Sequence, residues 1–341
     1  MKTLAYVMSF AMIATPVVFS SGCASSGRSG TQAREAVTAG TVEANGITLA
    51  YESYGSEDRE TVLLIGGTGM QLIDWPMELV HELVGRGYRV VRFDSRDVGL
   101  STHLDSAGLP DWAALQQAGE QGVPPPLAYT LEDMAADAVG LLDALGIERA
   151  HVAGASQGGA IAQLMAIHHP NRVASLTSIM AGSGNPALPL IAKPEAFASV
   201  GTPPAGDSLA ALVDHELRVR QALSSPGHAT DEQALRQQVE RSVRRAYNAA
   251  GLARQQAAAA VAHYQDRREA LRRVRVPTVV VHGAEDPVVP VQGGREVAES
   301  ILNAEFRLIP DGGHDLPVAF VPMIVDAITA AASRATGGKM D

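Results

Sequence analysis

From residue 41 onward, short apolar segments alternate with longer segments in which apolar residues recur every three or four positions. Short apolar runs bounded by glycine, proline or polar residues are typical of buried strands, and the longer periodic segments are typical of amphipathic helices. Strands that alternate with helices predict an α/β fold, in which helices cover both faces of a mostly parallel sheet. The predicted strands are 61–67, 88–94, 149–155, 173–181, 277–283 and 304–310.

Two segments carry clear local signals. Residues 41–55 (TVEANGITLAYESYG) place an Asn-Gly pair between two strand-like runs, which is typical of a tight hairpin. Residues 130–146 predict a helix, because Thr130 and Asp133 match a capping box at its start and Gly146 follows its last apolar position.

Residues 183–275 interrupt the alternation. They contain no strand pattern, but have proline-rich loops followed by segments rich in Ala, Gln and Arg. Within 232–250, apolar side chains recur at every fourth position and predict one apolar stripe on a charged helix, formed by Leu235, Val239, Val243 and Tyr247. Because this region lies between two predicted strands, we expect a helical cap inserted into an α/β core made of 41–182 and 276–335.

Composition and charge narrow the class of protein. The 341 residues are 46% hydrophobic, which is enough for a large core. The net charge of −10 argues against a nucleic-acid-binding surface, since phosphate binding needs clustered Lys and Arg. Residues 267–277 (RREALRRVRVP) form the single basic stretch, and we expect them to be a solvated helix face.

The first 22 residues have the pattern of a targeting segment. Lys2 supplies a positive start, residues 4–19 are apolar, and small residues follow at 20–22. The apolar run is shorter than the roughly 20 residues that cross a bilayer, and Pro16 interrupts it. We therefore expect a signal peptide over 1–22.

Cys23 is the single cysteine of the chain, so no internal disulfide can form. It could be a core cysteine or a nucleophile, but its place after Ser-Ser-Gly resembles the processing site of bacterial lipoproteins, in which this cysteine carries the lipid. Residues 23–40 are polar, as expected of a tether. We expect export to the bacterial cell envelope, with a membrane anchor at Cys23 favoured over simple secretion.

The sequence GASQG (154–158) matches the motif G-x-S-x-G and joins a predicted strand to a predicted helix. A serine in a turn is usually only a turn residue, but in this context the motif is typical of a nucleophile. The tight turn needs Gly154 and Gly158 where side chains would collide. It would raise the Ser156 hydroxyl above the carboxyl ends of the strands, where ligands bind in such folds.

A nucleophilic serine needs a base, and the base needs an orienting acid. His314 is the candidate base, because the segment PDGGHDLP (310–317) places it on a glycine-rich loop between the last predicted strand and the last predicted helix. The candidate acids are Asp286 and Glu285, which both follow the strand at 277–283.

An acyl-transfer site also needs two backbone N–H groups that face the developing oxyanion. Gln157 would supply one of them as the residue after the nucleophile. The other is expected from the loop at 66–76, with Thr68 favoured and Gly67 as the alternative. No Lys-Ser or Lys-Thr follows these glycines, which argues against a phosphate-binding loop.

The chain resembles serine hydrolases of the α/β-hydrolase fold over roughly residues 41–335. The segments that carry the resemblance are GTGMQLIDWP (67–76), YRVVRFDSRDVGLST (88–102), YTLEDMAADAVGLLDALGIERAHVAGASQGG (129–159), GAEDPVVP (283–290) and GGHDLP (312–317). Within that family it resembles bacterial carboxylesterases of the type that includes aclacinomycin methylesterase and pimeloyl-carrier methyl esterases. The family pattern G-x-x-D-x-x-x-P places Asp286, and not Glu285, at the acid position.

The resemblance implies a hydrolase that cleaves small-molecule carboxylic esters through an acyl-enzyme, without a cofactor or metal ion. An amidase, a lactonase or a proline iminopeptidase would use the same residues, so these activities stay open. A lipid-anchored binding protein without turnover is the alternative from another class. The sequence does not specify the acyl group, the alcohol or the oligomeric state.

Overall fold

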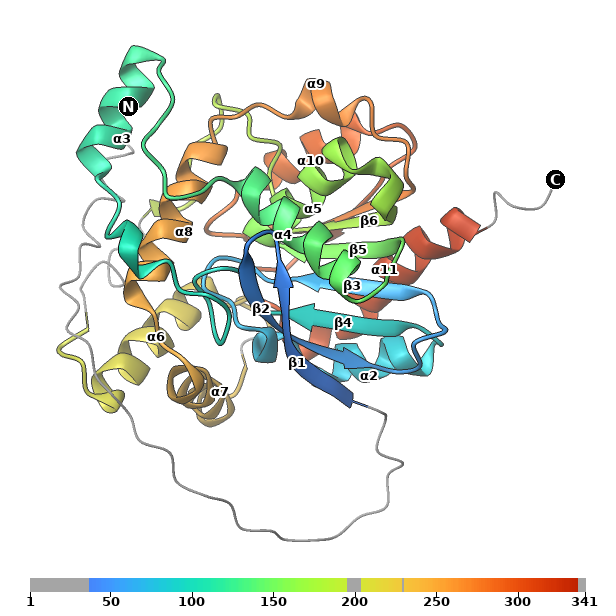
Figure 1. The fold of residues 1–341 in the computed structure, drawn as a ribbon, viewed down its shortest axis with the longest axis horizontal. Helices are drawn as coiled ribbons and strands as arrows, with labels where there is room; N and C mark the ends of the chain where they lie inside the picture. Colours follow the sequence, from blue (N-terminus) through green and yellow to red (C-terminus); the bar gives the residue numbers. More distant parts are fainter. Residues whose placement is uncertain (1–36, 195–203, 229, 337–341) are drawn as a thin grey trace, which may run out of the picture.

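A mixed sheet forms the centre of the molecule. The computed structural model describes residues 37–194, 204–228 and 230–336, so the predicted signal peptide and Cys23 lie outside the described residues. The strand order is β1-β2-β4-β3-β5-β6-β7-β8 (Figure 1). β2 is antiparallel to both of its neighbours, β1 and β4, and the six strands β3 to β8 are parallel to one another. The strands are β1 (Val37–Ala44), β2 (Ile47–Tyr54), β3 (Thr61–Ile65), β4 (Arg89–Phe93), β5 (Ala150–Ala155), β6 (Val173–Ile179), β7 (Thr278–Gly283) and β8 (Glu305–Ile309).

Each predicted strand is present within a few residues of its expected limits, and Asn45 and Gly46 form the hairpin turn with φ values of 49° and 78°. The predicted tether is too long at its C-terminal end, however. β1 begins at Val37, which pairs with Tyr54 of β2. The first residues of this edge strand are exposed, so they lack the apolar alternation by which a strand is recognised in a sequence.

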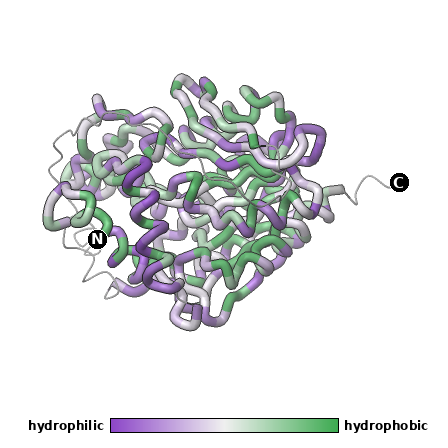
Figure 2. Tube along the Cα trace, turned by 90° about the horizontal axis from the view of Figure 1, so that it is seen from below, coloured by the Kyte–Doolittle hydropathy of each residue, from purple (hydrophilic) through white to green (hydrophobic). Residues whose placement is uncertain are grey.

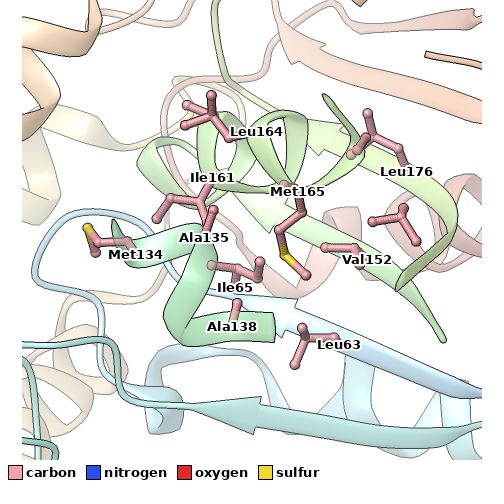
Figure 3. Close-up of a cluster of buried hydrophobic side chains, with 14 of the residues drawn as sticks. Leu63, Ile65, Met134, Ala135, Ala138, Val152, Ile161, Leu164, Met165 and Leu176 are labelled. Carbon is pink, nitrogen blue, oxygen red and sulfur yellow. The ribbon is translucent and has the colours of Figure 1, made fainter. Parts of the chain in front are cut away.

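Helices cover both faces of the sheet, as the alternating pattern predicts. One face packs against α4, α5 and α10, and the other packs against α2 and α11. Figure 3 shows the first of these cores, and Figure 2 shows that hydrophobic positions concentrate at the centre of the molecule. The helices are α2 (Met77–Gly85), α3 (Trp112–Gln121), α4 (Leu131–Ala144), α5 (Gln157–His168), α6 (Leu209–Leu223), α7 (Glu232–Arg245), α8 (Ala249–Ala262), α9 (Arg268–Leu271), α10 (Val291–Ser300) and α11 (Val321–Thr336).

The C-terminal helical segment passes a simple length and composition test for a membrane span over Val318–Ala335. Its apolar side chains are instead buried against the sheet and α2, as in the core helix of a globular domain; they include Ile324, Val325, Ala327, Ile328 and Ala331.

The predicted helix at 130–146 is confirmed, including its caps. The hydroxyl of Thr130 accepts a hydrogen bond from the backbone N–H of Asp133, and the Asp133 side chain accepts one from the backbone N–H of Thr130. Gly146 follows the helix with a φ of 65°, a conformation that glycine adopts without a steric penalty.

The single helix expected over 232–250 is wrong, because the chain forms two helices there. α7 ends at Arg245, and Ala246 is extended with φ of −170° and ψ of 130°. The side chain of Asn248 then caps α8 by accepting a hydrogen bond from the N–H of Gly251. The apolar stripe continues across this break and conceals it in the sequence, since Tyr247 keeps the four-residue spacing.

The predicted solvated basic helix over 267–277 is also wrong in part. α9 is short, and Arg267 at its start is buried. The Arg267 guanidinium donates hydrogen bonds to the side-chain oxygen of Gln163 and to the carbonyl oxygens of Ala262 and Gly182. Burial lowers its pKa to about 10. The sequence pattern cannot reveal this, because the partners are neutral oxygens and two of them, in Gln163 and Gly182, are distant along the chain.

Helices α6, α7 and α8 lie on the side of the molecule toward which the parallel strands point (Figure 1). Each of these helices carries one arginine that forms an ion pair with a buried aspartate outside the three helices. The pairs are Arg220 with Asp74 at 2.9 Å, Arg245 with Asp94 at 2.7 Å, and Arg254 with Asp97 at 2.6 Å. Three ion pairs therefore fix the consecutive helices α6, α7 and α8 to the loops that follow β3 and β4.

The pair of Arg254 and Asp97 is the most enclosed of the three. Both oxygens of Asp97 accept hydrogen bonds from Arg254, and the Tyr129 hydroxyl donates a further one. Burial alone would raise the pKa of Asp97, but these hydrogen bonds and the arginine charge lower it below its ordinary value. Asp97 is therefore held ionised in the interior by its partners.

Replacing Arg254 by methionine should destabilise the protein by about 3–5 kcal/mol, because it leaves the Asp97 carboxylate buried without a counter-charge. Replacing Arg244, whose pair with Glu240 on α7 is exposed, should change the free energy of unfolding by less than about 1 kcal/mol. Urea unfolding of both variants measures the difference. Equal stabilities would show that the cap is not held by the buried pair.

Candidate active site

Ser156 sits at a strained turn between β5 and α5. Its φ and ψ are 55° and −123°, a region that a residue with a side chain seldom adopts. Its N–H donates to the carbonyl of Ile179 on β6, at 2.9 Å, which ties the turn to the sheet.

The glycines around the serine make this turn sterically feasible. A methyl group on Gly154 would lie 2.0 Å from the carbonyl oxygen of Gly158, and one on Gly158 would lie 2.1 Å from the carbonyl oxygen of Ile65. Such distances are far inside van der Waals contact, so both positions require glycine. The steric role predicted for these glycines is confirmed.

The three residues predicted for a triad form one hydrogen-bonded chain. The Nε2 atom of His314 lies 2.8 Å from the hydroxyl oxygen of Ser156, and its Nδ1 atom lies 2.8 Å from Oδ2 of Asp286. They come from segments that are far apart in the sequence, and each follows the carboxyl end of a different parallel strand: β5, β7 and β8. This arrangement is the one in which a serine hydroxyl can lose its proton to an imidazole.

Asp286 is buried and held on several sides. Its Oδ1 atom accepts hydrogen bonds from the backbone N–H groups of Val288 and Val289, at 2.8 and 2.9 Å. Burial would raise its pKa, but the charge of His314 and the hydrogen bonds of His282 and His314 outweigh burial and hold the pKa well below its ordinary range. An ionised Asp286 can orient the imidazole.

Glu285, the rival acid, does not face the serine. Its carboxylate forms an exposed ion pair with Lys193 at 2.6 Å. The geometry therefore selects Asp286, in agreement with the spacing of the motif.

His282 is a neighbour of the site that the sequence does not identify. Its Nε2 atom lies 3.0 Å from the carbonyl oxygen of Val289 and 3.3 Å from Oδ2 of Asp286. Because both neighbours are acceptors, Nε2 carries a proton and supports the same carboxylate oxygen of Asp286 that His314 contacts. A histidine within a strand usually suggests only a core position, so no local signal marks this contact.

The loop of His314 is hydrogen-bonded to the last residue of α6 and to the segment that follows this helix. The N–H of His314 donates to the carbonyl of Leu223, and the N–H of Gly313 donates to the hydroxyl of Ser225, both at 2.8 Å. Ser225 is completely buried and donates its own hydroxyl proton to Asp315. The position of the imidazole therefore depends on residues of the cap.

The loop after β3 passes directly beside the serine. A methyl group on Gly67 would lie 3.1 Å from Cβ of Ser156, and the following residue, Thr68, lines the same cavity as the serine. Gln157 is buried and opens α5, where a backbone N–H has no partner within the helix. Ser156 therefore lies between the two backbone segments that were predicted to form an oxyanion hole.

Gln255 of α8 connects these two segments. Its side-chain oxygen accepts a hydrogen bond from the N–H of Gly69 at 2.8 Å, and its carbonyl oxygen accepts one from the side chain of Gln157 at 3.0 Å. Its amide group donates to the carbonyl of Arg96, and the residue is completely buried. Sequence analysis missed Gln255, because it lies in an Ala- and Gln-rich helix far from every motif.

Ser156 and His314 border a cavity of about 1140 Å³ between the core and α6, α7 and α8. Such a volume exceeds what a small acyl group fills. Within the described ranges, no cluster of three His, Cys, Asp or Glu side chains has an arrangement that could hold a metal ion.

Comparison with known proteins shows relatives along most of the chain. Rhodomycin D methylesterase of Streptomyces peucetius is 29% identical over 312 residues, which cover 85% of this chain and 96% of that protein. A putative carbamate hydrolase of Variovorax paradoxus is 28% identical over 272 residues, covering 78% and 89%. The crystal structure of the enol-lactonase from Burkholderia xenovorans superposes with a TM-score of 0.65 at 23% identity, covering 85% and 100%.

The sequence profile described as the alpha/beta hydrolase fold matches residues 60–318, about three quarters of the chain. This match includes the turn of Ser156, Asp286 and the loop of His314. The profile and the sheet order agree with the sequence-based assignment of the fold. The chain therefore belongs to the α/β hydrolase fold family.

Proposed function

We propose that the protein is a carboxylic ester hydrolase that works through an acyl-enzyme on Ser156. The observation that carries the proposal is the chain of two 2.8 Å contacts from Ser156 through His314 to Asp286, at the edge of a cavity with room for a substrate. The methylesterase named among the relatives supports an ester as the substrate class.

In the first half of the reaction, the Ser156 oxygen attacks the ester carbonyl carbon while Nε2 of His314 takes its proton. The resulting oxyanion accepts hydrogen bonds from the backbone N–H groups of Gln157 and Thr68. The tetrahedral intermediate then collapses, the bond to the alcohol oxygen breaks, and His314 returns the proton to the leaving alcohol. Asp286 stabilises the imidazolium that exists between these steps.

In the second half, water takes the place of the alcohol. His314 removes a proton from the water as the water oxygen attacks the acyl carbon. The second tetrahedral intermediate expels the Ser156 oxygen, which recovers its proton from His314, and the carboxylic acid is released. The same cycle would cleave amides, lactones or carbamates. A lactonase and a carbamate hydrolase are named among the relatives, so these bonds are the second candidate class.

The cap would select the substrate. We assign residues 183–275 to the cap and residues 41–182 and 276–335 to the α/β core, with the strand from Val37 added to the core. Support comes from α6, α7 and α8, which border the cavity.

We also propose that the protein is exported and anchored in the envelope through a lipid on Cys23. The apolar segment at 4–19 and the small residues before the cysteine support this localisation. Detergent partitioning of the wild type and of Cys23→Ser tests it. The wild type should enter the detergent phase and the variant should not, whereas equal partitioning would contradict the anchor.

Replacing Ser156 by alanine should lower kcat for p-nitrophenyl esters by on the order of 10⁶-fold, and His314→Ala should be comparable, because the members of a triad act together. Asp286→Asn should cost less, on the order of 10⁴-fold. Circular dichroism provides the control for folding. A folded Ser156→Ala protein with wild-type turnover would refute the mechanism.

Replacing Gln255 by leucine should lower kcat by about 100-fold with little change in KM, because the loop that carries Thr68 would lose the hydrogen bond from the N–H of Gly69 to the Gln255 side chain, whereas the bond from Gln157 to the Gln255 backbone carbonyl would remain. The matched control is Gln256→Leu, at the next position of the same helix, which also borders the cavity. Steady-state kinetics of both variants measure kcat and KM separately. A rise in KM alone, or equal effects at both positions, would argue against a role of Gln255 in positioning.

A further inference from the structure

The wall of the cavity formed by α6 and α7 contains a carboxylate that the proposed mechanism does not use. Glu216 of α6 borders the cavity together with apolar side chains of both helices, including Val219, Leu235, Val239 and Val243. Among the described residues, Glu216 has no hydrogen bond or ion pair. Burial is the main influence on this group and raises the pKa of its carboxyl, although the charge of Arg220 acts in the opposite direction.

A second polar group with no partner adjoins this carboxylate. Tyr247 also borders the cavity, and its hydroxyl is buried without a hydrogen-bond partner among the described residues. Its pKa is raised to about 12, first by burial and then by the negative charge of Glu216. Buried polar groups are nearly always paired in folded proteins, so the unpaired Tyr247 hydroxyl needs an explanation. The carboxylate of Glu216 is half-buried, borders the same cavity and also has no partner among the described residues.

The other enclosed charges that border the cavity are already paired. Arg220 is bound to Asp74, and Asp97 is bound to Arg254. Asp315 is held by Ser225, and Arg267 is surrounded by neutral oxygens. Glu216 therefore adds to a largely apolar wall a carboxylate that has no hydrogen bond or ion pair among the described residues, although the charge of Arg220 acts on it.

We propose that the substrate is an ester whose apolar body carries a basic nitrogen, and that Glu216 binds the resulting ammonium group. A cation supplies both the charge and the hydrogen-bond donor that Glu216 lacks, and such charge-assisted hydrogen bonds are stronger than neutral ones. This inference rests on the proposed ester hydrolysis, because it concerns the substrate of the same site. It makes Glu216 a residue that determines specificity and leaves the chemical step to Ser156.

The test compares two series of p-nitrophenyl alkanoates of increasing chain length, one ending in a dimethylamino group and the other in an isopropyl group of the same shape. At the chain length that reaches Glu216, wild-type kcat/KM should be about tenfold higher for the amino ester. Glu216→Gln should abolish this preference and leave kcat/KM for the isopropyl ester within about twofold. Glu232→Gln, at an exposed carboxylate that also borders the cavity, is the matched control and should keep the preference.

Calorimetric titration with an alkyldimethylamine provides a measurement that does not depend on turnover. The amine should bind the wild type and the Glu232→Gln variant about tenfold more tightly than it binds Glu216→Gln. Hydrolysis of both ester series without an amine preference, or a preference that survives in Glu216→Gln, would overturn this inference and leave ester hydrolysis standing. If neither ester series is hydrolysed, the proposed function fails. In the calorimetric titration, equal binding of the amine to the three proteins would overturn the role of Glu216.

Discussion

The close approach of the start of α5 to the end of β5 and to the end of its neighbour β3 is the constraint on which the site depends. Gly154 and Gly158 approach each other and the end of β3 within distances that no side chain could occupy, and this approach forces Ser156 to a positive φ. The serine hydroxyl is consequently held above the strand ends, 2.8 Å from His314. The backbone strain is maintained by a core packed on both faces of the sheet, so the stability of the fold and the geometry of Ser156 are linked.

The helices that border the cavity, α6 to α8, also help to position the residues of the site. Ser225 fixes the loop of His314, and Gln255 joins the loop after β3 to Gln157. The ion pairs of Arg220, Arg245 and Arg254 hold the helices that carry or precede these residues on the core. Movement of these helices would therefore disturb the imidazole of His314 and the loop after β3. We therefore expect substrate selection and catalytic geometry to be coupled in this protein.

The sequence predicts the fold and the chain of Ser156, His314 and Asp286, because strands, turns and nucleophile motifs leave local patterns of apolar residues and glycines. It does not predict contacts between distant segments that leave no periodic signal. Gln255, Ser225 and His282 were missed for this reason, and Arg267 was wrongly expected to be solvated. The break between α7 and α8 was missed because the apolar spacing continues across it. A sequence therefore predicts motifs whose residues are close together in the chain, whereas the partners of buried polar groups depend on the completed fold.

The central claim is that Ser156 is the nucleophile of an acyl-transfer site, and covalent labelling tests it most directly. The purified protein would be treated with a fluorophosphonate, digested and mapped by mass spectrometry, with and without an excess of an ester substrate. The account predicts one phosphonyl group, on the peptide that contains Ser156, and slower labelling when the ester is present. Folded protein that hydrolyses esters but carries no adduct on Ser156 would contradict it.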